Sequence, residues 1–227
     1  MPMIDAAKAM PMIRRKFLVL SAAAAMVAAA LAFPGGQAQA QAKPDVDLNA
    51  LMQQGALPDN VTGNADAPVT IIEYSSMTCP HCAAFHKEVL PELKKKYIET
   101  GKVKYIVREF PLDNVAVTAA MLARCVEPAK YMDFVDLLYQ RQEAWAFKDE
   151  PLPELAKFAK QVGFTEERFN QCIGDQKTLE HINAVRDRGS KEFKVRATPS
   201  FFVNGVRVKG AATIQKFDEL IAAGAKS

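Results

Sequence analysis

The feature that most restricts the fold of this chain is a pair of cysteines, Cys79 and Cys82, at the start of a helical pattern. An apolar run over residues 69–74 precedes the pair and predicts a strand buried on both faces. The helical spacing continues to Tyr97, with a kink expected at Pro91. A strand that leads through Cys-x-x-Cys into a helix is typical of a redox pair.

The predicted position of Cys79 at a helix N-terminus favours an ionised sulfur. Unpaired backbone N–H groups and the positive end of the helix dipole would stabilise a thiolate there. His81, as an imidazolium, would stabilise the same thiolate. Cys82 lies one turn further along the helix and is expected to be shielded. We therefore expect an exposed Cys79 sulfur that can form a disulfide with a protected Cys82.

The Cys-Pro-His-Cys motif at residues 79–82 follows a strand that ends in Glu73-Tyr74. This arrangement resembles the active site of DsbA-type thiol:disulfide oxidoreductases in the thioredoxin superfamily. The dipeptide Pro80-His81 is the one typical of the strongly oxidising members. Residues 197–205 resemble the family's cis-proline loop and the hairpin after it. The resemblance covers the chain from about residue 66 onwards and implies an α/β, thioredoxin-like fold that needs no cofactor.

Glu73 interrupts the apolar run of the predicted strand, and two environments are open for it. Near the end of the strand, it could turn towards water. The family resemblance instead implies a buried carboxylate six positions before the first cysteine, where it could tune the pair and help to relay a proton to or from Cys82.

Pro199 precedes a predicted strand over residues 200–203, an Asn204-Gly205 hairpin turn and a return strand over residues 206–208. A trans proline at the start of the strand is the simple alternative. The resemblance implies a cis peptide bond between Thr198 and Pro199, opposite the cysteines, with the Thr198 backbone pairing with an extended substrate. The best-known strongly oxidising DsbA proteins have Val before this proline, so Thr198 leaves the redox potential open.

The remaining patterns predict a split domain with an insertion. Residues 66–111 and 195–227 carry the βα patterns of the thioredoxin-like domain. Residues 112–194 are helical in pattern almost throughout, which predicts an inserted all-helical domain, and the DsbA-like family carries a helical domain at this place. Residues 43–65 are expected to form a polar N-terminal arm with at most a few helical residues.

Cys125 and Cys172 fall on two different predicted helices of the insertion. In an exported protein, an oxidising compartment would join them wherever their geometry allows, and we favour this disulfide. Two buried thiols that behave as small apolar residues are the alternative. A redox relay is disfavoured because neither cysteine has a Cys-x-x-Cys partner. Some DsbA-like proteins carry a structural disulfide in their helical domain, which supports the pairing.

Residues 1–42 carry the features of an export signal. Arg14-Arg15-Lys16 precedes an apolar run over residues 17–33, and small residues offer cleavage near Ala40 or Ala42. An uncleaved membrane anchor is the alternative, but the run is short and rich in alanine. We favour the Sec route, because the residues around the arginine pair fit the twin-arginine pattern poorly. The predicted location is the periplasm.

Charge and ligand patterns exclude several classes of function. Residues 1–42 hold four basic residues and one acidic residue, which account for the formal charge of +3. The remaining residues are formally neutral and give no sign of a nucleic-acid or anionic-membrane partner. Cys79, His81, Cys82 and His86 could suggest zinc, but no second cysteine pair lies nearby and we expect no metal. A monomer is expected.

These observations predict a dithiol oxidase for exported proteins. A substrate thiolate attacks Cys79 of the oxidised pair and expels Cys82, and a second substrate cysteine then releases Cys79. By resemblance, a DsbB-like membrane protein would reoxidise the pair and pass electrons to quinone. Two alternatives remain. One is an isomerase or reductase with the same cysteines, although residues 43–65 are too short for the family's dimerisation domain. The other is a peptide-binding or chaperone module.

Overall fold

A mixed five-stranded β-sheet forms the centre of the structure, a computed structural model in which residues 43–224 are described. The strands lie in the order β1-β3-β2-β4-β5. β2 and β3 run parallel, and the other neighbouring pairs are antiparallel. The strands are β1 (Asn60–Gly63), β2 (Val69–Ser75), β3 (Val103–Glu109), β4 (Ser200–Val203) and β5 (Val206–Arg207). The predicted export signal at residues 1–42 lies outside the described residues.

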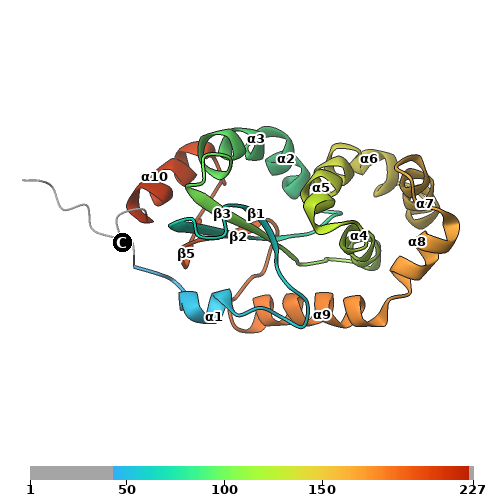
Figure 1. Cartoon of the computed structure of the whole chain (residues 1–227), viewed down its shortest axis with the longest axis horizontal. Helices are drawn as coiled ribbons and strands as arrows, with labels where there is room; N and C mark the ends of the chain where they lie inside the picture. Colours follow the sequence, from blue (N-terminus) through green and yellow to red (C-terminus); the bar gives the residue numbers. More distant parts are fainter. Residues whose placement is uncertain (1–42, 225–227) are drawn as a thin grey trace, which may run out of the picture. The chain divides into compact units, whose positions relative to one another are not determined.

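Helices surround the sheet and extend beyond one of its ends (Figure 1). They are α1 (Leu48–Met52), α2 (Pro80–Glu88), α3 (Leu90–Leu93), the π-helical turn η1 (Lys94–Ile98), α4 (Asn114–Arg124), the 3-10 turn η2 (Pro128–Lys130), α5 (Tyr131–Gln140), α6 (Gln142–Trp145), α7 (Pro151–Gln161), α8 (Glu166–Ile173), α9 (Gln176–Lys191) and α10 (Ile214–Gly224). Within residues 43–224, none of these helices has the length and apolar character needed to span a bilayer.

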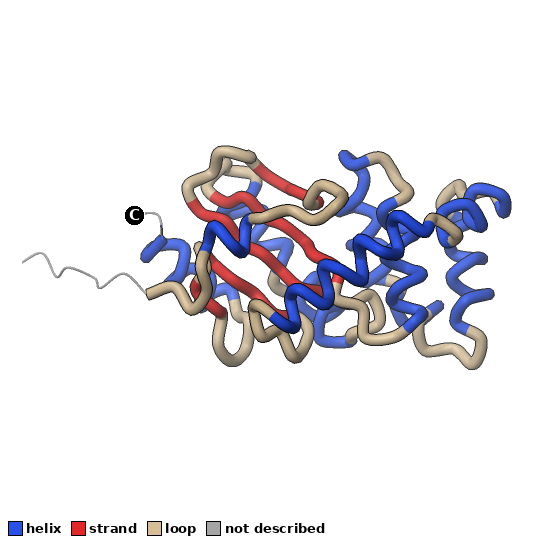
Figure 2. The backbone as a smooth tube through the Cα atoms, turned by 90° about the horizontal axis from the view of Figure 1, so that it is seen from below, coloured by secondary structure: helices blue, strands red, loops and turns tan. Residues whose placement is uncertain are grey.

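The two faces of the sheet pack against different helices (Figures 1 and 2). Successive side chains of a strand point to opposite faces, so β2 divides its residues between two cores. Val69 and Ile71 join the core formed with α2, α3 and α10. Ile72 and Tyr74 join the core formed with α1 and the end of α9. Six of the seven residues of β2 are buried, which explains the nearly continuous apolar run.

The helical pattern of residues 112–194 is confirmed by α4 to α9. Residues 128–145 do not form one continuous helix and are divided into η2, α5 and α6. The backbone of Arg141 leaves the helical region there, with φ −103° and ψ 13°. α9 differs from the other helices of this segment because it runs along the sheet (Figure 2), where Phe193 and Val195 after it join the core.

The N-terminal arm contributes an edge strand that the sequence pattern did not predict. β1 pairs antiparallel with β3, and its side chains alternate between half-buried and exposed. The arm is held by polar contacts: Arg108 forms an ion pair of 2.9 Å with Asp59, and Asn60 Nδ2 donates to Glu109 Oε1 at 3.2 Å. An edge strand that is fixed by its partner needs no apolar run of its own, so its sequence does not stand out from the polar arm around it.

The predicted kink near Pro91 and the predicted hairpin turn at residues 204–205 are both confirmed. The helix after the cysteine motif is interrupted between α2 and α3, and Pro91 lies in the first turn of α3. Asn204 and Gly205 both have positive φ, 46° and 83°, as a type I′ hairpin turn requires. Asn204 Oδ1 also accepts a hydrogen bond of 2.7 Å from the backbone N–H of Thr70, which ties the turn to β2.

Candidate active site

The cysteines of the Cys-Pro-His-Cys motif lie where β2 passes into α2. Cys79 is the N-cap residue, with an extended backbone (φ −80°, ψ 119°), and Pro80 occupies the first turn. A proline there removes an N–H that would have had no partner within the helix. Cys82 follows in the same turn. Both cysteines are free thiols, so the structure describes the reduced pair.

The surroundings of Cys79 stabilise its thiolate. The hydrogen bond from the Cys82 thiol contributes most, burial opposes it, and the backbone N–H groups of Cys82 and His81 add further hydrogen bonds. Together they lower the pKa of Cys79 from 9.0 to about 5. His81 acts on the Cys79 sulfur through its backbone N–H, and not through its ring as predicted from the sequence.

The pKa of Cys82 is shifted in the opposite direction. Burial raises its pKa well above the ordinary value, and the hydrogen bond to Cys79 and the negative charge of Glu73 raise it further. A hydrogen bond from Ser75 acts in the other direction. The pair is therefore asymmetric, because one sulfur holds a negative charge and the other keeps its proton at neutral pH.

Cys79 is less exposed than expected from the sequence. Its exposed fraction is 5%, compared with 0% for Cys82. The sulfur of Cys79 lies 3.2 Å from the Thr198 carbonyl oxygen, so the loop before β4 lies against it. The expectation of an exposed Cys79 sulfur is therefore wrong, because both cysteines are buried; Cys79 is only the less deeply buried of the two.

The loop before β4 contains a cis peptide bond between Thr198 and Pro199. Thr198 is 8% exposed, and its Oγ1 is buried without a hydrogen-bond partner among the described residues. Pro199 comes directly before β4, which pairs with β2. Strand pairing thus brings residues 198–199 next to Cys79, more than 100 positions away in the sequence.

Gln142 is a site residue that the sequence analysis missed. It begins α6 at the helix break and is 2% exposed. Its Nε2 donates to the backbone oxygen of Met77 at 2.8 Å and to that of Cys79 at 3.0 Å. The amide therefore satisfies two buried carbonyl groups of the turn that carries Cys79. No spacing in the sequence relates Gln142 to this turn, because it lies on another helix.

Glu73 lies in β2, fully buried, and does not face water. Ser75 Oγ donates to Glu73 Oε1 at 2.8 Å, and the Tyr105 hydroxyl donates a very short hydrogen bond to Glu73 Oε2. His86 Nε2 lies 3.2 Å from the same oxygen. A buried carboxylate needs such partners, and here they come from three different elements.

His86 connects Glu73 with the surface. Its Nδ1 lies 2.8 Å from Asp136 Oδ1 on α5, and Lys94 forms an ion pair with the other oxygen of Asp136. Burial alone would lower the pKa of His86, but the charges and hydrogen bonds of Glu73 and Asp136 raise it to about 9. From the sequence, His86 was indicated only as a possible metal ligand. Its place one turn after Cys82 was the signal that could have drawn attention to it.

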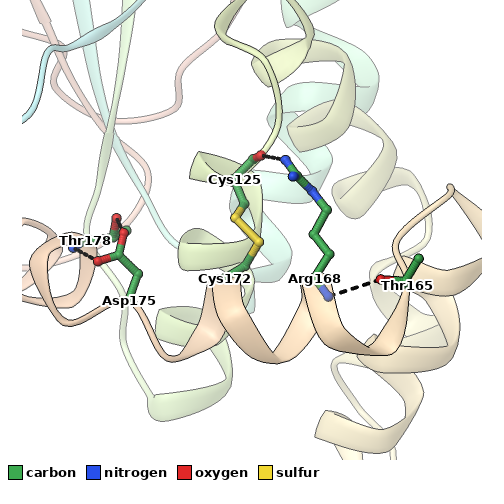
Figure 3. The surroundings of a disulfide bond; sticks show 6 residues. All are labelled: Cys125, Thr165, Arg168, Cys172, Asp175 and Thr178. Atoms are coloured by element: carbon green, nitrogen blue, oxygen red, sulfur yellow. Dashed lines mark hydrogen bonds between the residues drawn. A yellow bond between two sulfur atoms is a disulfide. The ribbon is translucent and has the colours of Figure 1, made fainter.

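Cys125 and Cys172 form a disulfide that joins the end of α4 to α8, with a Cα–Cα distance of 5.8 Å (Figure 3). Arg168 Nη2 also donates to the Cys125 carbonyl at 2.7 Å, and its backbone N–H donates to Thr165 Oγ1 at 3.1 Å. This disulfide involves different helices from the Cys79–Cys82 pair. Within residues 43–224, no three His, Cys, Asp or Glu side chains are arranged to hold a metal ion.

Comparisons with known proteins agree with this geometry. A family model described as Thioredoxin matches residues 56–223. A protein of Rickettsia bellii named "Putative protein-disulfide oxidoreductase" is 36% identical over 177 residues, which cover 78% of this chain and 68% of the relative. A Rickettsia typhi relative with the same kind of name is 39% identical over 66% of this chain, and the match spans only 56% of its length.

Solved structures are similar as well. The crystal structure of Wolbachia pipientis alpha-DsbA1 superposes with a TM-score of 0.71 and 31% identity, covering 78% of this chain and 96% of the other. Bacillus subtilis BdbD, at 22% identity, shares the fold with a TM-score of 0.67, covering 82% of this chain and 98% of the other. The chain therefore belongs to the DsbA-like branch of the thioredoxin family and is a thiol:disulfide oxidoreductase.

Proposed function

We propose that this oxidoreductase works as a dithiol oxidase, which donates a Cys79–Cys82 disulfide to exported proteins in the periplasm. The observation that carries the proposal is the asymmetry of the pair: the pKa of Cys79 is lowered to about 5, while that of Cys82 is raised. A stabilised Cys79 thiolate is a good leaving group and favours the reduced enzyme, so the disulfide form is a strong oxidant.

The reaction follows from this asymmetry. A substrate thiolate attacks Cys79 of the disulfide and expels Cys82, which takes up a proton. A second substrate thiolate then attacks the substrate sulfur, which forms the substrate disulfide and releases Cys79 as a thiolate. Two substrate thiols are oxidised, the enzyme gains two electrons, and one of the two substrate protons ends on Cys82.

The other site residues are assigned supporting roles. The position of the Thr198 backbone beside the Cys79 sulfur supports a substrate that approaches as an extended chain and pairs with Thr198. Pro80 shapes the helix start, and His81 and Glu73 tune the two sulfurs. We assign the Cys125–Cys172 disulfide a structural role.

Export and reoxidation are part of the proposal. The predicted signal at residues 1–42 supports a periplasmic location, with the Sec route favoured. Each turnover leaves the enzyme reduced, so an acceptor must take two electrons from it. A DsbB-like membrane quinone reductase is the class of partner that this family resemblance favours.

Refolding of ribonuclease tests the proposal. With reduced, unfolded ribonuclease, the oxidised protein should form disulfides stoichiometrically, and Cys79→Ser/Cys82→Ser should be inactive. With scrambled ribonuclease, the reduced protein should restore little activity. Efficient rescue of scrambled ribonuclease would instead indicate an isomerase, and activity in the double variant would indicate a chaperone.

A further inference from the structure

A continuous row of polar side chains leads from Cys82 towards the surface. Ser75 and Glu73 on β2 are joined by the 2.8 Å hydrogen bond from Ser75 Oγ to Glu73 Oε1. His86 on α2 follows, with Nε2 3.2 Å from Glu73 Oε2. Asp136 on α5 ends the row, 2.8 Å from His86 Nδ1. These three contacts are within hydrogen-bonding distance, and the Ser75 side chain also hydrogen-bonds to the Cys82 sulfur, so a proton can pass from one group to the next.

Exposure increases along this row. The side chains of Glu73 and His86 are 0% and 1% exposed, whereas those of Asp136 and Lys94 are 18% and 23% exposed. Cys82 itself is 0% exposed, so water has no direct access to its sulfur. A proton that reaches or leaves Cys82 needs a route through the protein, and Asp136 is where this row of side chains meets solvent.

Two tyrosines that contact this row, Tyr105 and Tyr139, keep their protons. Tyr105 on β3 donates to Glu73, and burial raises its pKa well above the ordinary value. Tyr139 on α5 contacts Ser75 at 2.6 Å and packs on the His86 ring, with 4.3 Å between ring centroids. Burial likewise raises the pKa of Tyr139.

Lys94 on η1 is the remaining charged neighbour, paired with Asp136. Because burial raises both of their pKa values, Tyr105 and Tyr139 stay neutral. His86 lies between two carboxylates and is the group that can hold and release a proton.

We propose that the Ser75–Glu73–His86–Asp136 row is a proton path that connects Cys82 with solvent, with Asp136 as its outer end. The inference rests on the proposed function, because only a redox cycle changes the protonation of Cys82. It extends the role considered for Glu73 by assigning the rest of the route and its exit to named residues.

The steps balance as follows when the disulfide is reduced. The new Cys82 thiolate takes the Ser75 proton, and Ser75 takes one from Glu73, which has received it from His86 Nε2. The transfer uses the neutral form of His86 with its proton on Nε2: as Nε2 releases this proton to Glu73, Nδ1 accepts one from Asp136, which takes it from water. One proton enters at Asp136 and one arrives at Cys82. On oxidation, the same steps run in reverse and Cys82 becomes a nucleophilic thiolate.

A two-step reaction with glutathione tests the path. Reduced protein is mixed with excess oxidised glutathione, quenched with acid and analysed by mass spectrometry. In the first step, the Cys79 thiolate forms a mixed disulfide and releases one glutathione thiolate. In the second, Cys82 loses its proton and displaces the other. We expect Asp136→Asn to leave the first step unchanged and to slow the second about tenfold at neutral pH.

Controls separate the path from general damage. Asp136→Glu should recover most of the second-step rate. Asp218→Asn changes a similar surface carboxylate, paired with Lys96 at 2.8 Å, and should leave both steps unchanged. The second-step rate of Asp136→Asn should rise more steeply with pH than that of the natural protein, because hydroxide must then remove the proton. In the natural protein, D₂O should slow the second step more than the first.

Three outcomes would overturn the inference. Equal second-step rates in Asp136→Asn and Asp218→Asn would exclude Asp136 as the exit. Equal solvent isotope effects on both steps of the natural protein would exclude a proton path independently of any variant. A missing first step in the natural protein would overturn the proposed function, and the path with it, so the two failures can be distinguished.

Discussion

At the scale of single residues, the chemistry depends on how differently Cys79 and Cys82 are surrounded. Cys79 lies at the start of α2, where backbone N–H groups have no partner within the helix. Cys82 lies one turn further along, fully buried and close to the charge of Glu73. The same element therefore lowers the pKa of one thiol and raises that of the other.

Ultraviolet titration of the thiolate tests this difference. In the reduced protein, Cys79 should titrate at about pH 5, and Cys82→Ala should raise that pKa because the largest hydrogen bond to the thiolate is lost. Cys79→Ser should abolish the transition. The lowered pKa means that the thiolate stabilises the folded reduced protein at high pH, and this stabilisation is lost as pH falls from 9.0 towards about 5. A midpoint close to 9.0 would contradict the assignment.

The pKa of His86 is raised, so its effect on stability has the opposite dependence on pH. Its pKa is raised from 6.5 to about 9, so its charge stabilises the folded state fully below pH 6.5, and this contribution is lost as pH rises through 9. Urea unfolding of the oxidised protein should show a decrease of about 3 kcal/mol over this range. His86→Gln should remove the dependence, whereas His81→Gln, at an exposed position, should keep it. A decrease of equal size in His86→Gln would show that another group is responsible.

At the scale of elements, α4 and α8 are held together by the Cys125–Cys172 disulfide. Replacing both cysteines by alanine should lower the free energy of unfolding by about 4 kcal/mol on the chain-entropy model. The redox behaviour of the Cys79 pair should not change. Urea unfolding and the glutathione equilibrium of the same variant measure the two effects. A changed equilibrium would mean that the second disulfide is coupled to the first.

α6 supports the turn before α2 through Gln142. Gln142→Leu would leave the backbone oxygens of Met77 and Cys79 buried without their present donor, and should cost about 2 kcal/mol of stability. Gln140→Leu, at an exposed position on α5, is the matched control and should cost much less. Similar losses in the two variants, measured by urea unfolding, would argue against this support.

Several elements could be predicted because their signals are local. The apolar run gave β2, the Asn204-Gly205 pair gave the hairpin, and Pro91 gave the interruption after α2. β1 could not be predicted, since its register is set by β3. The contacts of Glu73 and His86 could not be predicted either. Tyr105, which bonds to Glu73, and Asp136, which bonds to His86, lie on elements distant in the sequence. Local spacing shows which groups are reactive, and tertiary packing decides which groups control them.

At the scale of the whole molecule, strand pairing and helix packing surround one reactive turn. β4 brings Thr198 to Cys79, α6 brings Gln142 to the same turn, and α5 brings Asp136 to the network behind it. Elements from residues 66–111, 112–194 and 195–227 thus all contribute to the site. The redox potential is consequently a property of the assembled structure.

The equilibrium with glutathione tests the central claim most directly. The protein is incubated at neutral pH in buffers of known reduced-to-oxidised glutathione ratio, and the reduced fraction of the Cys79–Cys82 pair is counted by thiol labelling. A stabilised Cys79 thiolate predicts a potential less negative than about −200 mV, above the range of glutaredoxins. A potential of about −270 mV, the value of thioredoxin, would contradict the account, because the Cys79–Cys82 disulfide would then be more stable than the reduced pair.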